Sequence, residues 1–251
     1  MAAPSIQPSF RAHYIRYSGS IAGRDRILQL IQYAARFMAW KLARAKYSPQ
    51  AVEKYDAIKR QIILTRKLWR VGRFIDLLNG VYLSLPRKAP ANPISHYLTL
   101  GRQLSLASYL FIDSCTAVDA IGLVKIRSMP RLSRMCIQLW ATGLVFGISN
   151  GLYRVAGILR ARARAVQSSP DGKGGEKVTV QTTSPTSVVA ATPIVSAEEQ
   201  KAVILQLSAD IADFHVASSA LNLHGLNDGV VSVAGMWSSL IGIYFQWRQT
   251  A

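Results

Sequence analysis

The sequence predicts an all-α membrane protein with amphipathic helices, about two transmembrane helices and a disordered linker. Three observations lead to this fold class. Half of the 251 residues are hydrophobic and only 17% are charged. Two uncharged stretches, residues 135–153 and 229–247, approach the roughly 20 residues that a helix needs to cross a bilayer. Residues 165–197 are rich in Ser, Thr, Pro and Gly and lack apolar periodicity, as is typical of disordered segments.

Four regions are expected along the chain. Residues 1–97 form a basic N-terminal region of amphipathic helices, and residues 98–160 contain hydrophobic helices with the first transmembrane span. Residues 161–197 form the linker, and residues 198–251 contain a further amphipathic helix and the second span. The net charge of +17 resides in the first two thirds of the chain. This asymmetry favours an anionic phospholipid membrane as the partner, whereas the absence of zinc-finger and RNA-binding signatures argues against nucleic acid.

The first helices can be placed from their end signals. After an irregular start, a helix is expected from Gly23 to about Lys46, with its apolar residues on one face. Ser48 and Pro49 then begin a second helix, because proline is favoured at the first helical position. This second helix is expected to continue without interruption to about residue 83.

Residues 59–83 carry the strongest functional signal. At helical spacing they place an apolar stripe on one side and a basic stripe roughly opposite. A cationic amphipathic helix of this kind is typical of a membrane interface, with the apolar face in the lipid and the cations at the headgroups. The alternative is a helix that packs on a neighbouring helix and exposes its arginines to water. The apolar stripe is Leu64, Leu68, Val71, Ile75, Leu78 and Tyr82, and the basic stripe is Lys59, Arg66, Arg70 and Arg73.

Residues 103–124 are apolar but are not expected to cross the membrane. Asp113 and Asp119 would each cost about 2.5–3.5 kcal/mol near the bilayer centre, and about eight large apolar residues return only about 0.5 kcal/mol each. A buried or interfacial helix is therefore predicted for this stretch.

The two uncharged stretches contain small residues at helical spacing, which favours close helix packing in lipid. Gly143, Gly147 and Gly151 repeat every fourth residue in the first span and form a flat ridge. Gly235 and Gly242 are each four residues from a serine in the second span. We expect these glycines to mediate helix packing and homo-oligomerisation. Between the spans, Ser196 and Glu199 form a capping box that begins an amphipathic helix reaching about residue 223.

No catalytic or metal-binding pattern is visible in the sequence. The four histidines are scattered, and none shares a helix face with a cysteine or carboxylate at ligand spacing. No glycine-rich phosphate loop follows a strand, and the two cysteines form neither a disulfide framework nor a metal site. The sequence therefore predicts a protein that is not an enzyme and that holds no cofactor and no metal.

Four segments resemble the peroxin-11 family, whose members elongate and divide peroxisomes. They are residues 23–42, 65–78, 139–159 and 223–242. The resemblance implies a peroxisomal membrane protein whose amphipathic helix inserts into one leaflet, whose oligomers concentrate the effect, and whose partners include dynamin-class fission machinery and its adaptors. It further implies a membrane-inserting role for Leu64, Leu68, Val71, Ile75 and Leu78, and lipid contacts for Lys59, Arg66, Arg70 and Arg73.

Two other functions remain open at this stage. A pore-forming channel for metabolites in the same membrane is favoured by the small and polar residues of the spans, and by Asp113 and Asp119, which could line a pore. An adaptor that docks division factors through the basic N-terminal region is compatible with membrane insertion.

Overall fold

The computed structural model describes residues 10–85, 90, 92–167 and 196–250, and within these residues all regular structure is α-helical. The all-α fold class is therefore confirmed. The expected linker lies mostly outside the described residues. The helices are α1 (Phe10–Gly19), α2 (Ile21–Arg44), α3 (Pro49–Arg70), α4 (Arg73–Ser84), α5 (Pro93–Ala120), α6 (Met129–Gln167), α7 (Ala197–Ala220) and α8 (Asp228–Gln249).

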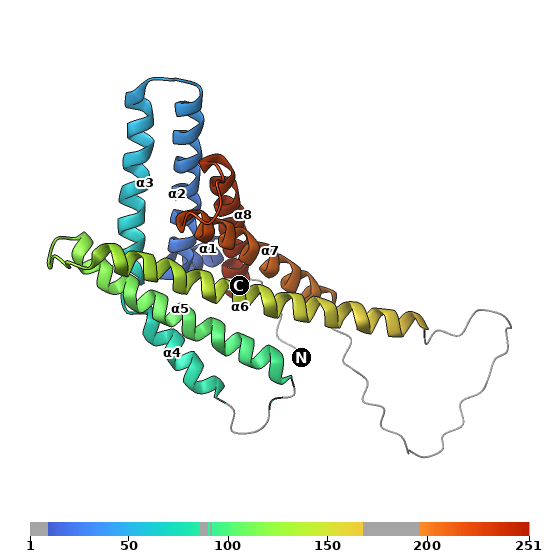
Figure 1. Cartoon of the computed structure of the whole chain (residues 1–251). Coiled ribbons are helices and arrows are strands. Elements are labelled where there is room, and N and C mark those ends of the chain that lie inside the picture. The colour runs from blue at the N-terminus through green and yellow to red at the C-terminus, as the bar shows by residue number, and fades with distance from the viewer. Residues whose placement is uncertain (1–9, 86–89, 91, 168–195, 251) are drawn as a thin grey trace, which may run out of the picture.

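Six of these helices pack in a closed ring. Along the ring, α2 contacts α3, α3 contacts α5, α5 contacts α6, α6 contacts α7, α7 contacts α8, and α8 returns to α2. Outside the ring, α4 packs on α5 and α1 packs on α2. Figure 1 shows α2 and α3 as an upright pair, while α5 and α6 run side by side across the view. The segments on either side of the linker are thus interleaved in one bundle.

Side chains at the helix starts satisfy free backbone N–H groups, as the sequence signals suggest. Ser196 accepts a hydrogen bond from the N–H of Glu199 at 3.2 Å, as expected for the predicted capping box. Asn227 accepts one from Val230 at 3.0 Å, and Ser20 accepts one from Gly23 at 2.9 Å. Pro49 is in the first turn of α3, as predicted.

The continuous helix expected over residues 59–83 is wrong, because the chain breaks between α3 and α4. Val71 has an extended backbone with ψ 129°, and Gly72 has φ +83°, in the left-handed region that glycine enters without steric penalty. The break redirects the chain so that α3 stays against α2 while α4 packs along α5 (Figure 1).

The irregular start expected before residue 23 is also wrong from residue 10 onward, because α1 is helical and joins the two ends of the chain. The Nε2 atom of His13 lies 2.8 Å from the backbone oxygen of Trp247, near the end of α8. The indole of Trp247 also packs against the rings of Phe10 and Tyr17 at centroid distances of 5.7 and 5.4 Å.

The two expected spans correspond to α6 and α8, each long and apolar enough to cross a membrane. α6 has 39 residues, so it is about 58 Å long, nearly twice the hydrocarbon thickness of about 30 Å. It runs to Gln167, so residues 161–167, expected at the start of the linker, are helical. The expected boundary after residue 97 falls inside α5, and the one after residue 160 falls inside α6. In Figure 1, α6 crosses the direction of α2 and α8 steeply.

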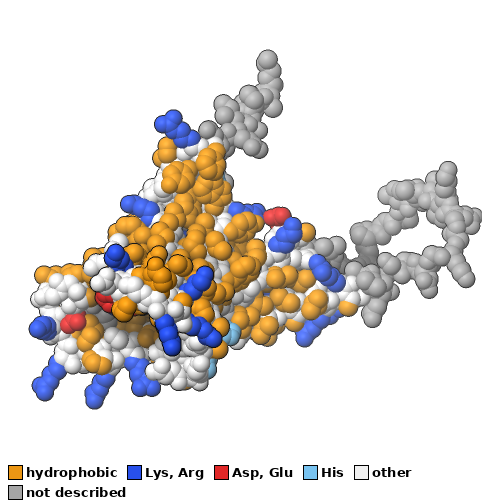
Figure 2. All heavy atoms as spheres, turned by 90° about the horizontal axis from the view of Figure 1, so that it is seen from above, with side chains coloured by type: hydrophobic (Ala, Val, Ile, Leu, Met, Phe, Trp, Pro, Cys, Tyr) orange, Lys and Arg blue, Asp and Glu red, His pale blue; other side chains and the backbone are white. Residues whose placement is uncertain are grey.

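The interior of the ring is small and the exterior is unusually apolar. One core cluster brings together Tyr33, Val216 and Val231, with Trp140 packed against them. Many large hydrophobic side chains face outward instead, and hydrophobic side chains cover much of the face in Figure 2, with Lys and Arg side chains between and around them. An apolar exterior of this extent is typical of a membrane contact rather than of a water-exposed surface.

We predict that Gly72→Ala destabilises the fold whereas Gly80→Ala does not. Neither added methyl group would meet another atom, but only Gly72 has positive φ, which costs an L-residue about 1–2 kcal/mol. Gly80 lies within α4, where alanine stabilises a helix by about 1 kcal/mol. Thermal unfolding followed by circular dichroism in detergent should show a lower midpoint for Gly72→Ala only. Equal midpoints in the two variants would contradict this account of the break.

Candidate membrane-binding surface and buried ion pairs

The outward face of α4 is apolar and exposed. Ile75 is 60% exposed, Tyr82 69% and Leu83 73%, and Leu78 lies beside them at helical spacing. The opposite face packs on α5, where the ring of Phe74 meets that of Phe111 edge to face at 5.3 Å. The helix therefore has one face bound to the protein and another that is free for lipid.

The rest of the predicted apolar stripe is on α3 and the connecting turn. Leu68 and Val71 are exposed, and Leu64 is half-buried. The stripe is thus exposed at five of its six positions, but the break at Gly72 divides it between two helices. α4, with Ile75, Leu78 and Tyr82, carries the more exposed half.

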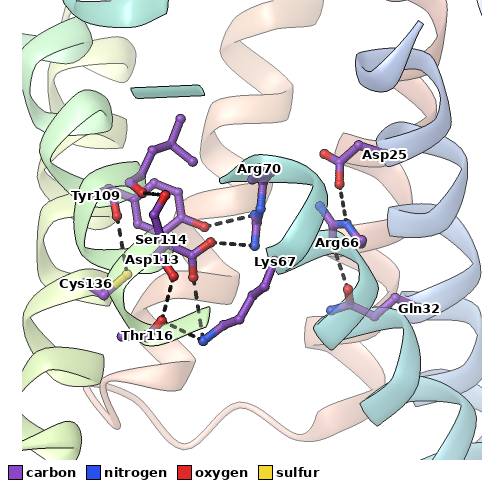
Figure 3. A network of polar contacts seen from close by, with 11 residues as sticks. Asp25, Gln32, Arg66, Lys67, Arg70, Tyr109, Asp113, Ser114, Thr116 and Cys136 are labelled. Carbon is purple, nitrogen blue, oxygen red and sulfur yellow. Dashed lines mark hydrogen bonds and ion pairs between the residues drawn. The ribbon is translucent and has the colours of Figure 1, made fainter. Parts of the chain in front are cut away.

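The basic stripe turns toward the protein, which sequence periodicity alone did not indicate. Arg66 is only 8% exposed and donates from Nε to Asp25 Oδ1 at 2.9 Å and from Nη1 to Gln32 Oε1 at 2.7 Å. Figure 3 shows this side chain reaching from α3 to α2. Burial opposes ionisation of Asp25, but the charge and hydrogen bond of Arg66 outweigh it, so the pKa of Asp25 lies below its ordinary value.

A second cluster joins α3 to α5. Asp113 is 3% exposed and forms an ion pair with Arg70 at 2.9 Å, with Lys67 3.7 Å away. Arg70 also donates to the hydroxyl of Tyr109 at 3.0 Å, and Lys67 to that of Thr116 at 2.9 Å (Figure 3). The lysine and arginine thus neutralise a carboxylate that would otherwise oppose burial of this helix.

The assignment of the whole basic stripe to lipid headgroups is therefore not what this conformation shows. Arg66 and Arg70 are paired inside the protein because Asp25 and Asp113 need counter-charges there. Lys59 lies beside Asp56 on its own helix, and Arg73 is half-buried at the start of α4. Exposed cations lie elsewhere, including four in the connection between α5 and α6 and the first turns of α6: Lys125, Arg127, Arg131 and Arg134.

A third ion pair joins α5 to α7 and was missed in the sequence. The two terminal guanidinium nitrogens of Arg102, Nη1 and Nη2, donate hydrogen bonds to the carboxylate of Asp210 at 2.5 and 2.6 Å. Gln206 donates to the same carboxylate at 2.9 Å. The separation of 108 positions between the two partners left no local signal for this contact. The sequence does place Asp210 and Asp213 among apolar residues of α7, and a carboxylate needs a partner when it is buried.

The glycine ridge of α6 packs within the chain. A methyl group at Gly143 would lie 3.2 Å from Leu106 of α5, and one at Gly151 would lie 2.9 Å from Leu207 of α7. At Gly147 it would meet the Arg102–Asp210 ion pair, 2.8 Å from the Asp210 carboxylate. The ridge thus lets α5 and α7 approach α6 closely.

The glycines of α8 serve the same purpose against α2. A methyl group at Gly235 would overlap the ring of Tyr33, and one at Gly242 would lie 2.8 Å from the Arg26 side chain. The helix-packing role predicted for these glycines is consistent with their contacts. In this conformation α2, α5 and α7 pack against these five glycines, and the homo-oligomerisation role stays a prediction.

The carboxylates expected to line a pore have other partners. Asp113 is held by Arg70 and Lys67, and Asp119 accepts a hydrogen bond from the backbone N–H of Ile126 at 2.8 Å, which closes the turn between α5 and α6. Two histidines also have polar partners: His13 contacts the backbone oxygen of Trp247, and His224 contacts the hydroxyl of Ser218. Among the described residues, no group of three His, Cys, Asp or Glu side chains could hold a metal ion.

The comparisons with known proteins agree on one protein family. The family model for peroxisomal biogenesis factor 11 matches residues 11–247. The chain is 21% identical to peroxisomal biogenesis factor 11 of Schizosaccharomyces pombe over 239 residues, which cover 94% of each chain. It is 23% identical to a peroxisomal membrane protein 11 homolog of Dictyostelium discoideum, over 95% of this chain and 94% of the relative. It is 20% identical to the peroxisomal membrane protein PMP27 of Saccharomyces cerevisiae, over 94% of both. No solved structure matches the chain.

We predict that Arg66→Met lowers stability much more than Arg60→Met, although both remove one arginine from α3. Removing one partner of a buried ion pair costs about 3–5 kcal/mol, because it leaves Asp25 buried and unpaired. Arg60 and its partner Glu53 are both more than half exposed, so breaking that pair costs less than about 1 kcal/mol. The measurement is the unfolding midpoint of each purified variant in detergent.

The buried pair also predicts the direction of acid sensitivity. Because the pKa of Asp25 is lowered in the folded state, its stabilisation is present above the unfolded value of about 3.9 and is lost as the pH falls below it. Arg66→Met should therefore lose less stability than the unmodified chain when both are acidified through this window. Parallel losses in the two proteins would argue against a stabilising ion pair.

Proposed function

The chain belongs to the peroxisomal biogenesis factor 11 family, and on this basis we propose that it remodels the peroxisomal membrane by inserting the outer face of α4 into one leaflet. As a family member it is a peroxisomal membrane protein with a role in peroxisome proliferation. Its relatives are named for biogenesis and for the membrane, not for an enzymatic reaction. The observation that supports insertion is the exposed apolar face of α4, which the protein leaves uncovered while its other face packs on α5.

The energy available from this face is sufficient for membrane binding. Ile75, Leu78, Tyr82 and Leu83 would each gain about 1–1.5 kcal/mol by half burial, or about 5 kcal/mol together. Because α4 lies on one side of the bundle, the inserted area is added to one leaflet only. Area added to a single leaflet bends a membrane, and the effect grows with the number of molecules.

Exposed cations away from the basic stripe supply the electrostatic part of binding. Lys125, Arg127, Arg131 and Arg134 all face outward at the connection between α5 and α6. A cation near an anionic membrane contributes about 1 kcal/mol, and salt screens this contribution. We propose that these residues contact headgroups in place of Arg66 and Arg70.

Self-association and recruitment of dynamin-class fission machinery complete the proposed function. Both are implied by the family resemblance, and many copies are needed for leaflet expansion to deform a membrane. Because the glycines of α6 and α8 are covered within the chain, self-association would use another surface. The channel alternative loses its candidate pore-lining carboxylates, because Asp113 is engaged in an ion pair and Asp119 in a turn.

We predict that Ile75→Glu combined with Leu78→Glu abolishes membrane deformation. The variant loses about 3 kcal/mol of apolar burial, which corresponds to about a hundredfold weaker insertion of this face. The readouts are tubulation of anionic liposomes by the purified protein and the number and length of peroxisomes in cells that express the variant.

The matched control is Gln50→Glu with Gln61→Glu, two exposed polar positions on α3. It introduces the same two negative charges without altering the apolar face, so it should deform membranes like the unmodified protein at moderate salt. Unchanged tubulation by the α4 variant, or an equal defect in the control, would refute the insertion of this face.

A further inference from the structure

A partly open cavity, which the membrane function does not use, lies between α4 and helices of the ring. It has a volume of about 590 Å³ and is bounded by α2 to α7. Five arginines from four helices line it: Arg26, Arg66, Arg70, Arg73 and Arg102. Among the described residues, two carboxylates, those of Asp25 and Asp213, face the same space. A smaller cavity of about 200 Å³ shares Arg26, Arg102 and Asp213 with it.

Three of the arginines are paired and two are not. Arg66, Arg70 and Arg102 bind Asp25, Asp113 and Asp210 in the ion pairs described above. In the described part of the chain, no carboxylate oxygen lies within 4.0 Å of a side-chain nitrogen of Arg26 or Arg73. Arg26 donates to the side-chain oxygen of Gln29 at 3.0 Å.

The cavity and its ion-pair partners therefore carry an excess of positive charge. Lys67 joins the five arginines, and Asp25, Asp113, Asp210 and Asp213 oppose these six cations, which leaves an excess of two positive charges. Burial also disfavours the charged form of two of these groups, Arg26 and Asp213. Burial lowers the pKa of Arg26 although the charges of Asp213 and Asp25 oppose this shift, and burial raises the pKa of Asp213. One carboxylate oxygen of Asp213 is buried without a hydrogen-bond partner.

A hollow whose walls carry an excess of one charge attracts ions of the opposite charge, so this cavity favours an anion. Guanidinium groups bind phosphate oxygens through paired hydrogen bonds, and a phosphate monoester carries close to two negative charges at neutral pH. The remaining wall is mixed, with Gln29, Gln32, Tyr33 and Tyr109 beside an apolar part. The apolar part, made by Leu106, Leu110, Trp140 and Leu144, suits the organic group of such a molecule.

We propose that this cavity is a binding site for a phosphate monoester, with Arg26 and Arg73 as its principal ligands. The phosphate group neutralises the two unpaired guanidinium groups, and the organic group lies against the leucines and Trp140. The monoester is either a soluble metabolite or the headgroup of a lipid such as phosphatidic acid, since both present the same doubly charged group. The site is separate from the outer face of α4, so the two proposals can fail independently.

The test is binding to the purified full-length protein in detergent or nanodiscs, by isothermal titration calorimetry and thermal shift. Glycerol 3-phosphate represents the soluble source, and nanodiscs with phosphatidic acid in place of phosphatidylglycerol represent the lipid source. We expect saturable binding of at least one of the two and a rise in the unfolding midpoint. Binding should strengthen by about tenfold from pH 5 to pH 7, because the second phosphate pKa is about 6. Absence of saturable binding in both arms would overturn the proposal.

Two variants with opposite expected effects identify the site. Arg26→Gln with Arg73→Gln should weaken binding at least tenfold, whereas Arg16→Gln with Arg44→Gln, which removes the same charge from exposed positions, should not. Asp213→Asn removes a repelling carboxylate from the cavity wall and should tighten binding severalfold. This second variant keeps the test decisive if the double arginine variant does not fold. Equal affinity of Asp213→Asn and the unmodified protein at pH 7, or an equal loss in the exposed control, would contradict the assignment.

Discussion

The arrangement of this protein depends on ion pairs that join helices through their interiors. Arg66 meets Asp25, Arg70 meets Asp113, and Arg102 meets Asp210, so α3 is tied to α2 and to α5, and α5 to α7. A buried carboxylate without a counter-charge is costly, and each aspartate therefore fixes which face of its helix turns inward. The remaining faces, with their large apolar side chains, are left on the outside.

The burial of ion pairs and the exposure of large apolar side chains connect the interior of the protein to the proposed membrane function. In a water-soluble bundle the large apolar residues pack inside and the charges are solvated. Here Val203, Asp210 and Ala217 of α7 are buried, whereas Ile204 and Ile211 are exposed. On α4 the same principle leaves Ile75 and Tyr82 free, and the proposed insertion uses side chains that the ion pairs have kept out of the core.

The parts of this structure that could be predicted from sequence are those that local signals determine. Pro49 and Ser196 mark helix starts by chemistry within one turn of their own positions, and the two spans follow from length and lack of charge. The break at Gly72 had a local signal, a glycine inside the basic stretch, but apolar periodicity continues across it and favoured one helix. The orientation of Arg66 could not be derived in this way, because its partner Asp25 is 41 residues away in the sequence. For the same reason the spacing of Gly147 indicated close packing but not that Arg102 and Asp210 of the same chain would occupy it.

The contact between His13 and Trp247 restricts how the chain can be threaded through a bilayer. Residues in contact share one side of the membrane, so the number of crossings between them is even, and α6 cannot cross alone with α8 left outside. Either both helices cross or both lie along the surface. Because α6 and α8 run steeply across each other in Figure 1, a double crossing is incompatible with two upright helices in a flat bilayer. A double crossing instead requires a strongly inclined helix or a locally curved bilayer. The geometry of the folded chain would therefore itself favour curved regions of the organelle.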